Sequence, residues 1–191
     1  MNLILASQSP RRRVLLGLTG LDFVVRVADI DETMHETRAP AEEVARVSRE
    51  KALAVSREPD DVVIAADTIV VCEGEVLGKP KDAQDAFRML SLLSGRSHEV
   101  MTGMTVLRGD EIVTHTEVTR LRFRNLLPGE IRAYIASGEP MDKAGAYGIQ
   151  GGAALFCTRM EGDYYNVMGL PGGALSGILR TFGLPIWGVE V

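Results

Sequence analysis

The sequence contains little of what marks a disulfide-rich, zinc-binding or membrane protein. Two cysteines and three histidines occur in 191 residues, and neither Cys72 nor Cys157 lies in a CxxC or His-rich segment. A disulfide framework and a structural zinc site are therefore unfavoured. The apolar segment 1–6 is too short for a signal peptide, and no apolar run approaches the roughly 20 residues that span a bilayer. We therefore expect a cytoplasmic protein with no membrane partner.

Positive charge and aromatic side chains are also scarce. Lys and Arg number 21 against 26 Asp and Glu, which gives a net charge of -5, and aromatic residues make up only 5%. A nucleic-acid polymer is usually bound by a basic stripe interleaved with aromatic residues, so we expect no such partner. Any site for an anion must instead be local.

What remains is the composition of an ordinary folded protein. Hydrophobic residues make up 46% and charged residues 25%, so the chain can bury a core and is not expected to be disordered. Its length suits a single domain spanning 1–191, or two lobes that share one core.

The spacing of apolar residues predicts alternating strands and helices. The expected strands are 3–6, 23–27, 62–71, 98–107 and 112–124. The expected helices are 11–18, 40–58, 85–93, 127–138 and 175–182, and glycines are dense between 145 and 173. This order predicts an α/β fold with a mixed sheet, flanking helices and a cleft between two lobes. In the last long strand Arg120, Arg122 and Arg124 alternate with apolar residues, which indicates a solvated sheet face.

One residue interrupts the pattern of the helix predicted at 40–58. Lys51 lies four positions after Val47 and four before Val55, so it shares their inward face. A lysine there either extends its ammonium group to water or has a charged partner. The helix alone favours the first interpretation.

Asp67 interrupts the apolar run predicted as a buried strand. A carboxylate at such a position must be paired, bound to a metal or protonated, and each outcome is enriched at functional sites. The alternative is an aspartate that only ends the strand or caps a turn.

The segment Ser7–Arg13 leaves a strand and opens a helix, with Ser9 able to cap it and Pro10 at the first helical position. Backbone N–H groups, the positive end of the helix dipole and guanidinium groups would then converge on an anion. One of the three arginines should face away on angular grounds. The alternative is a row of solvated arginines.

A loop after the strand that carries Asp67 supplies Lys79 and Lys81, whose compact charges suit phosphate oxygens. It is not a P-loop, because the upstream glycine spacing is wrong and Pro80 stands where Ser or Thr is needed. No nucleophilic triad is apparent. The cations, carboxylates and glycine loops together suit phosphoanhydride chemistry, which depends on positioning, charge neutralisation and activation of a water molecule.

Six segments in order resemble the signature blocks of the Maf family of nucleoside triphosphate pyrophosphatases, and they cover nearly the whole chain. They are Leu5–Arg12, Ala66–Thr68, Gly78–Pro80, Leu93–His98, Glu139–Gly151 and Gly169–Pro171. The resemblance implies a fold similar to that of inosine triphosphate pyrophosphatases, with an elongated, twisted mixed sheet around a central cleft. It also implies a homodimer, and hydrolysis of a nucleoside triphosphate to monophosphate and pyrophosphate with Mg²⁺ or Mn²⁺.

The resemblance also implies a substrate class and site roles. One branch of the family prefers dTTP and UTP, and Arg11, Thr68 and Gln150 match its pattern at all three positions. Asp67 corresponds to the general base, and Asp67 or Glu32 could hold the metal ion. The family further lends substrate-binding roles to four residues, which are Ser7, Arg12, Lys51 and Lys79. The chain departs from the family at Gly172 and Gly173, which are expected to weaken the start of the last helix.

Two functions remain to be compared. The first is an enzyme that hydrolyses dTTP, UTP and modified pyrimidine nucleotides. The alternative is a nucleotide-binding regulator of cell division or septum formation with little turnover. Intact Asp67, Glu32 and Lys79 favour the enzyme.

Overall fold

The computed structural model describes residues 1–27, 29–35 and 37–189. Its strands are β1 (Leu3–Leu5), β2 (Val24–Val25), β3 (Val62–Cys72), β4 (Glu75–Leu77), β5 (Ser97–Arg108), β6 (Glu111–Phe123) and β7 (Cys157–Glu161). Its α-helices are α1 (Pro10–Gly17), α2 (Pro40–Ala54), α3 (Ala83–Leu93), α4 (Pro128–Ala136), α5 (Tyr164–Met168) and α6 (Gly172–Thr181). Short 3₁₀ helices are η1 (Glu139–Asp142), η2 (Ala144–Ala146), η3 (Gly152–Phe156) and η4 (Ile186–Gly188). The mixed α/β fold predicted from the sequence is confirmed.

The strands form one mixed sheet in the order β2-β1-β3-β5-β6-β7, with β4 paired to β3. β1 runs parallel to both β2 and β3, whereas β3 with β4 and β6 with β7 are antiparallel pairs. The segment 62–66 is buried throughout. A strand covered on both faces requires such a continuous apolar run, which is why periodicity alone did not show alternation there.

The chain divides into two compact units. Unit 1 comprises residues 1–67, 102–117 and 169–191, and unit 2 comprises residues 68–101 and 118–168. Strands β3, β5 and β6 are each divided between the units. The central cleft that the family resemblance implies stays a prediction.

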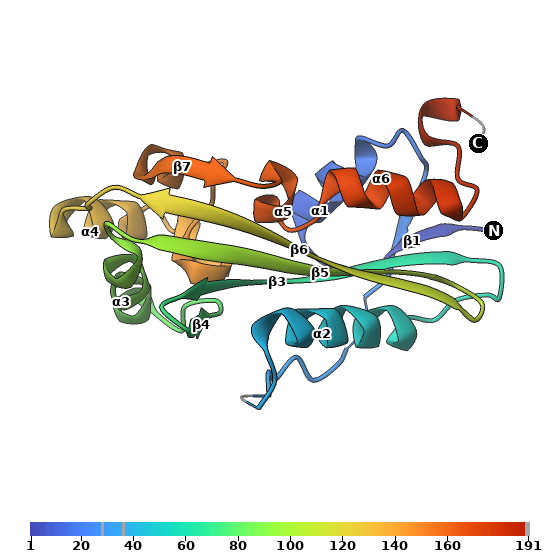
Figure 1. Cartoon of the computed structure of the whole chain (residues 1–191), viewed down its shortest axis with the longest axis horizontal. Helices are drawn as coiled ribbons and strands as arrows, with labels where there is room; N and C mark the ends of the chain where they lie inside the picture. The colour runs from blue at the N-terminus through green and yellow to red at the C-terminus, as the bar shows by residue number, and fades with distance from the viewer. Residues whose placement is uncertain (28, 36, 190–191) are drawn as a thin grey trace. The chain divides into compact units, whose positions relative to one another are not determined.

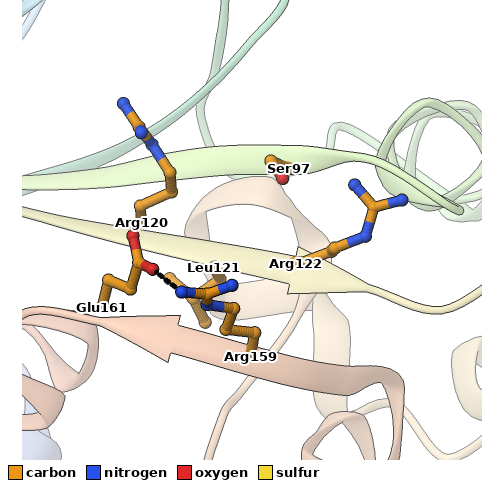
Figure 2. Close-up of a pocket in the computed structure, with 6 residues that line it drawn as sticks. All are labelled: Ser97, Arg120, Leu121, Arg122, Arg159 and Glu161. Carbon is orange, nitrogen blue, oxygen red and sulfur yellow. Dashed lines mark ion pairs between the residues drawn. The ribbon is translucent and has the colours of Figure 1, made fainter.

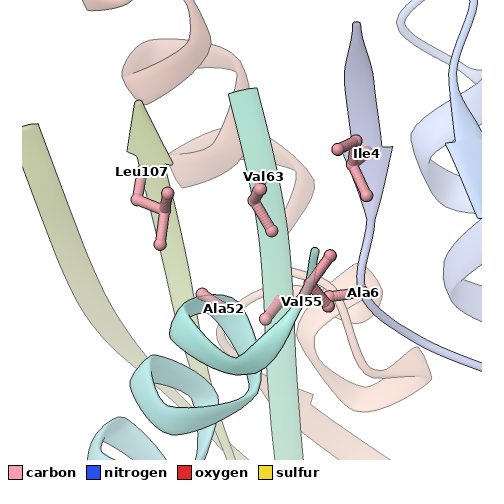
Figure 3. Close-up of a cluster of buried hydrophobic side chains, with 7 residues drawn as sticks. Ile4, Ala6, Ala52, Val55, Val63 and Leu107 are labelled. Atoms are coloured by element: carbon pink, nitrogen blue, oxygen red, sulfur yellow. The ribbon is translucent and has the colours of Figure 1, made fainter. Parts of the chain in front are cut away.

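In unit 1, α2 packs on one face of the sheet and α6 lies on the other (Figure 1). The apolar face of α2 meets β1, β3 and β5 in a cluster of buried side chains (Figure 3). Gly103 of β5 makes this close packing possible, because a Cβ atom there would lie 2.2 Å from the carbonyl oxygen of Val44 in α2. α2 is therefore fixed against the strand that carries Asp67.

Unit 2 has a core of aromatic rings in edge-to-face contact. Phe123 contacts Tyr147 with ring centroids 4.9 Å apart, and His98 lies 4.8 Å from Phe123. The His98 Nε2 atom is 2.8 Å from the Tyr147 hydroxyl group. Burial lowers the pKa of His98 to about 4, so this imidazole is neutral near pH 7 and acts as a core residue.

Several element boundaries differ from the sequence predictions. α2 ends at Ala54 rather than 58, because Val55 adopts an extended backbone with ψ of 133°. α6 begins at Gly172, so the two glycines form its first turn instead of delaying it. β4 was not predicted, since three residues are too few to show a period. Cys72 is buried, whereas Cys157 is only partly buried. No helix within residues 1–27, 29–35 and 37–189 is long and apolar enough to cross a membrane.

Candidate active site

The turn between β1 and α1 is organised by two serine hydroxyl groups. Ser9 caps α1, because its Oγ accepts a hydrogen bond from the backbone N–H of Arg12 at 3.5 Å. Ser7 is 8% exposed, and its Oγ accepts one from the backbone N–H of Ser9 at 3.2 Å. The predicted strand, turn and helix start are confirmed, with Pro10 in the first helical turn. Anion binding at this turn stays a prediction.

The guanidinium group of Arg12 is held at two points. Its Nε donates to the carbonyl oxygen of Gly169 at 2.7 Å, and its Nη1 donates to Ser7 Oγ at 3.3 Å. Burial lowers the pKa of Arg12, and the negative charge of Asp67 opposes this shift. Arg12 is therefore a positioned cation close to the Asp67 carboxylate.

The three arginines of α1 differ in exposure, as the angular argument predicted. Arg13 is exposed, whereas Arg11 and Arg12 are partly buried. After burial and Asp67, the positive charge of Arg11 is the next influence on Arg12, and it lowers the pKa of that guanidinium. Two cations thus lie together at the start of α1, while the third faces away.

Lys51 of α2 joins two carboxylates. Its Nζ lies 2.8 Å from Asp67 Oδ1 and 2.9 Å from Glu32 Oε2. The side chains of Lys51 and Asp67 are only 11% and 15% exposed, whereas that of Glu32 is 58% exposed. Lys51 is therefore an inward lysine with charged partners, and the interpretation that it extends to water is wrong. Of the three outcomes predicted for Asp67, which were pairing, metal binding and protonation, the structure shows pairing with Lys51.

These residues form a cluster of alternating charge within unit 1, made up of Arg12, Glu32, Lys51 and Asp67. Both carboxylates act on the Arg12 guanidinium, since each raises the pKa of that group against the effect of burial. Each carboxylate is thus near two cations, which stabilises two negative charges in close proximity. The cluster thus pairs two positive side chains with two negative ones.

Two carboxylates of this cluster could hold a divalent metal ion. Asp67 and Glu32 each present a carboxylate oxygen within hydrogen-bond distance of the same ammonium group, so their oxygens converge. Mg²⁺ is commonly held by one or two carboxylates, with water and substrate phosphates as the other ligands. Across the part of the chain that the structure describes, no group of three or more His, Cys, Asp or Glu could hold a metal ion.

The other predicted site residues belong to unit 2. Thr68 directly follows Asp67 in β3 and is partly buried, whereas Lys79 and Gln150 are exposed. The structure thus brings Ser7, Arg12, Glu32, Lys51 and Asp67 together, with Arg11 beside Arg12. The roles of Thr68, Lys79 and Gln150 stay predictions.

The backbone contact between Arg12 and Gly169 could not be predicted from the sequence. A glycine has no side chain to suggest a role, and the contact joins positions 157 residues apart. The only available signal was the position of Gly169 in a family block. A carbonyl oxygen that orients a guanidinium group can be found only from the tertiary structure.

A pocket of about 240 Å³ lies on strands of unit 2 and is a poor candidate for the site (Figure 2). It is lined by Ser97, Arg120, Leu121, Arg122, Arg159 and Glu161. Arg159 is paired with Glu161, and Arg120 and Arg122 extend away from Arg159 (Figure 2). None of the predicted site residues lines this pocket.

Known proteins resemble the chain over nearly its whole length. A family model described as Maf-like protein matches residues 2–182. A protein of Moorella thermoacetica named dTTP/UTP pyrophosphatase is 50% identical over 190 residues, which cover 97% of each chain. A protein of the same name from Symbiobacterium thermophilum is 53% identical over 186 residues, 97% of this chain and 96% of its own. Among solved structures, a HAM1 protein from Coxiella burnetii is 15% identical with a TM-score of 0.48, covering 95% of this chain and 99% of its own.

Proposed function

The chain belongs to the Maf-like protein family, and from that membership and the charge cluster of unit 1 we propose that it hydrolyses dTTP and UTP. The products are the nucleoside monophosphate and pyrophosphate, and modified pyrimidine nucleotides are further substrates. The observation that carries this proposal is the ammonium group of Lys51, which holds Asp67 and Glu32 together near Arg12. The names of relatives at 50% and 53% identity support the substrate pair. A regulator with little turnover is not favoured, because those relatives are named as enzymes.

Asp67 is the group that receives the proton of the attacking water. Its Oδ1 accepts a hydrogen bond from Lys51, whereas its Oδ2 accepts none from the residues described. The oxygen of the water forms a bond to the α-phosphorus, and the bond from that phosphorus to the α–β bridging oxygen breaks. Pyrophosphate leaves with the electron pair of the broken bond, and the proton of the water passes to Oδ2.

The cations neutralise the charge of the triphosphate and orient it. Arg12 is fixed by Ser7 and Gly169 before substrate binds, so little reorganisation is needed when the phosphate groups arrive. Arg11 and Lys79 are further cations that would neutralise the charge of the triphosphate. Lys51 keeps Asp67 and Glu32 in place.

Glu32 and Asp67 are the residues that would hold Mg²⁺ or Mn²⁺ together with phosphate oxygens. Such an ion supplies charge neutralisation on the phosphate oxygens and lowers the pKa of a water molecule bound to it. The exposure of Glu32, at 58%, leaves its carboxylate accessible to an ion that arrives with the nucleotide. Arg11, Thr68 and Gln150 are the residues that would select the pyrimidine substrates.

Two further parts of the proposal concern assembly and compartment. We propose a homodimer, as the family resemblance implies, and a cytoplasmic location, as expected from the sequence. Multi-angle light scattering of the purified protein would give the mass of the particle, and a monomeric mass of 20.7 kDa at working concentration would contradict the dimer.

The experiment that tests the reaction is a substrate panel with and without Mg²⁺ or Mn²⁺. Pyrophosphate release is measured from dTTP, UTP, CTP, ATP, GTP and 7-methylguanosine triphosphate, with wild type beside Asp67→Asn. We expect dTTP and UTP to be the best substrates. Asp67→Asn should lose about 10²-fold to 10⁴-fold in turnover while it still binds nucleotide. Preference for the methylated purine, or a fully active Asp67→Asn variant, would overturn the proposal.

A further inference from the structure

The acidic loop that carries Glu32 has little structure of its own. Residues 29–35 lie outside all helices and strands. The local order comes from Asp31, whose Oδ1 accepts hydrogen bonds from the backbone N–H of Thr33 at 2.9 Å and from its hydroxyl group at 2.5 Å. A turn of this kind shapes the loop, but it does not fix the loop against the rest of the protein. Another contact must place Glu32 beside Lys51.

Glu43 in the first turn of α2 supplies such a contact. Its side chain is 1% exposed, and its Oε2 accepts a hydrogen bond from the backbone N–H of His35 at 2.8 Å. The same oxygen lies 3.2 Å from His35 Nδ1. A hydrogen bond from Arg46 lowers the pKa of Glu43 to about 2, so the carboxylate is ionised at neutral pH. A buried anion on α2 thus binds the far end of the loop.

Arg46 supplies a second contact one turn further along α2. Its Nη2 donates to the carbonyl oxygen of Thr33 at 2.9 Å and to Glu43 Oε2 at 2.8 Å. Its Nη1 donates to Glu50 at 2.8 Å, so the guanidinium group is fixed on three sides. Thr33 directly follows Glu32, and therefore Arg46 holds the backbone carbonyl of the residue next to the proposed metal ligand.

The same helix therefore carries both the anchor of the loop and the lysine that the loop reaches. Glu43 precedes Lys51 by eight residues, which is about 12 Å along an α-helix. The loop is bound at Thr33 and His35 by the first half of α2, and its Glu32 carboxylate meets Lys51 in the second half. Because α2 is packed closely on the sheet, the loop contacts on α2 fix the position of Glu32 relative to Asp67 at the Lys51 ammonium group.

We propose that Glu43 and Arg46 are positioning residues that hold the acidic loop so that Glu32 lies beside Asp67 at the metal site. The inference rests on the proposed function for its effect on turnover, whereas the effect on the loop itself does not depend on it. Outer groups that orient a metal ligand typically change metal affinity or activity by about 10-fold to 100-fold when they are removed.

The principal variant is Glu43→Ala, with Glu43→Gln as the conservative partner. The alanine variant loses both contacts of Glu43 with His35, whereas glutamine keeps an oxygen that can accept from the His35 N–H. We expect Glu43→Ala to raise the Mn²⁺ concentration for half-maximal turnover by about tenfold or more, with the KM for dTTP at saturating metal little changed. Glu43→Gln should restore much of the loss, and it carries the test should the alanine variant not fold.

A matched control is Glu130→Ala. Glu130 also binds an arginine through both oxygens, Arg124 at 2.7 and 2.9 Å, and accepts from a backbone N–H, that of Leu127 at 2.9 Å. This substitution therefore removes the same kinds of contact far along the chain, at the start of α4. It should lower the melting temperature without any change in the metal dependence of turnover.

A double-mutant cycle with Glu32→Gln separates positioning from general destabilisation. If Glu43 acts through Glu32, Glu43→Ala should add little to the loss already caused by Glu32→Gln. Independent, multiplicative losses in the two backgrounds would overturn the inference, and so would a metal dependence shifted equally by Glu130→Ala.

Hydrogen exchange of the loop gives a readout that needs no turnover. In Glu43→Ala the His35 amide and its neighbours should exchange faster than in wild type, whereas Glu130→Ala should leave them unchanged. Unchanged exchange at His35 would overturn the inference even in an active enzyme. If wild type had no turnover but exchange responded as expected, the proposed function would fail and the anchoring of the loop would stand.

Discussion

Cationic side chains of the two units differ in burial and in their position within the local sequence pattern. In unit 1, Lys51 lies on the inward face of α2, is 11% exposed and contacts two carboxylates. In unit 2, Arg120 and Arg122 stand on the exposed face of β6, while Leu121 between them is buried. The arginines occupy the polar positions of the alternating pattern of β6, whereas the lysine occupies an apolar position in the helical pattern of α2. A charged residue at a position where the local pattern predicts an apolar one indicates the candidate active site, whereas charge alone does not.

The largest expected difference between these groups is in turnover. Lys51→Met should reduce kcat/KM for dTTP by about 10²-fold or more, because Asp67 and Glu32 lose the group that orients them. Arg120→Met is the matched substitution, and it removes a surface pair with Glu99 at 3.0 Å. Its kcat/KM should stay near that of wild type, since exposed pairs contribute little. Equal losses of kcat/KM in the two variants would contradict the distinction between Lys51 and Arg120.

A smaller effect on turnover is expected from Arg12 of α1, with Arg13 as its control. Arg12→Lys keeps the charge but cannot reproduce contacts to Gly169 and Ser7 from two nitrogens of one planar group. We expect about a tenfold loss in kcat/KM, a modest fraction of what charge removal would cause. Arg13→Lys, at an exposed position of the same turn, should be almost silent. Steady-state kinetics with dTTP and UTP compare the pair directly.

His98 is a buried polar residue outside the charge cluster. A substitution there tests the effect of burying a polar group without changing the candidate active site. Its pKa is lowered by burial from 6.5 to about 4, so the unfolded chain binds a proton more readily than the folded protein between those values. Stability is therefore lost as the pH falls from about 6.5 to about 4, by an amount on the order of 3 kcal/mol at most.

Urea denaturation at pH 7 and pH 4.5 measures this contribution in wild type and His98→Leu. The variant should show a smaller drop in the free energy of unfolding between the two pH values, while its turnover at neutral pH is retained. Glu43 acts in a lower range, because its pKa is lowered to about 2 and its contribution is lost only below pH 4.5. An identical pH dependence in both proteins would show that His98 does not titrate as described.

The smallest expected effect concerns the arginine face of unit 2. Arg122 of β6 lies directly opposite Arg159 of β7, and like charges in that position are unfavourable. Arg122→Glu should therefore stabilise the protein by a few tenths of a kcal/mol, with turnover unchanged. Thermal unfolding compares it with Arg122→Gln, which removes one charge without adding an attraction. A variant with altered substrate preference would instead make this face part of the site.

Much of the fold could be predicted from the apolar pattern, and the errors have local causes. The long strands and the five longest helices were found because each buries a periodic or continuous apolar face. The end of α2 was placed four residues late, since the sequence from Val55 to Glu58 contains no glycine or proline to stop a helix. β4 was missed because a three-residue strand is defined by its pairing with β3 rather than by its own pattern.

The candidate site was predicted in part for the same reason. Lys51 and Asp67 contradict the apolar segments that contain them, so each was visible as an exception. Glu43 and Arg46 were not visible, because a carboxylate and an arginine three positions apart are ordinary on a helix surface. Only the packing of the acidic loop on α2 makes Glu43 a buried anion with a backbone partner.

The sequence by itself determined the local elements of the site. These are the strand that carries Asp67, the helix that carries Lys51 and the capped turn before Arg12. These features follow from short-range spacing, which is written in the order of the residues. The tertiary structure alone decided that Lys51 meets Glu32 and Asp67, and that Arg12 is held by Gly169. Such contacts join positions far apart in the chain, and their geometry follows from the packing of helices on the sheet rather than from local sequence.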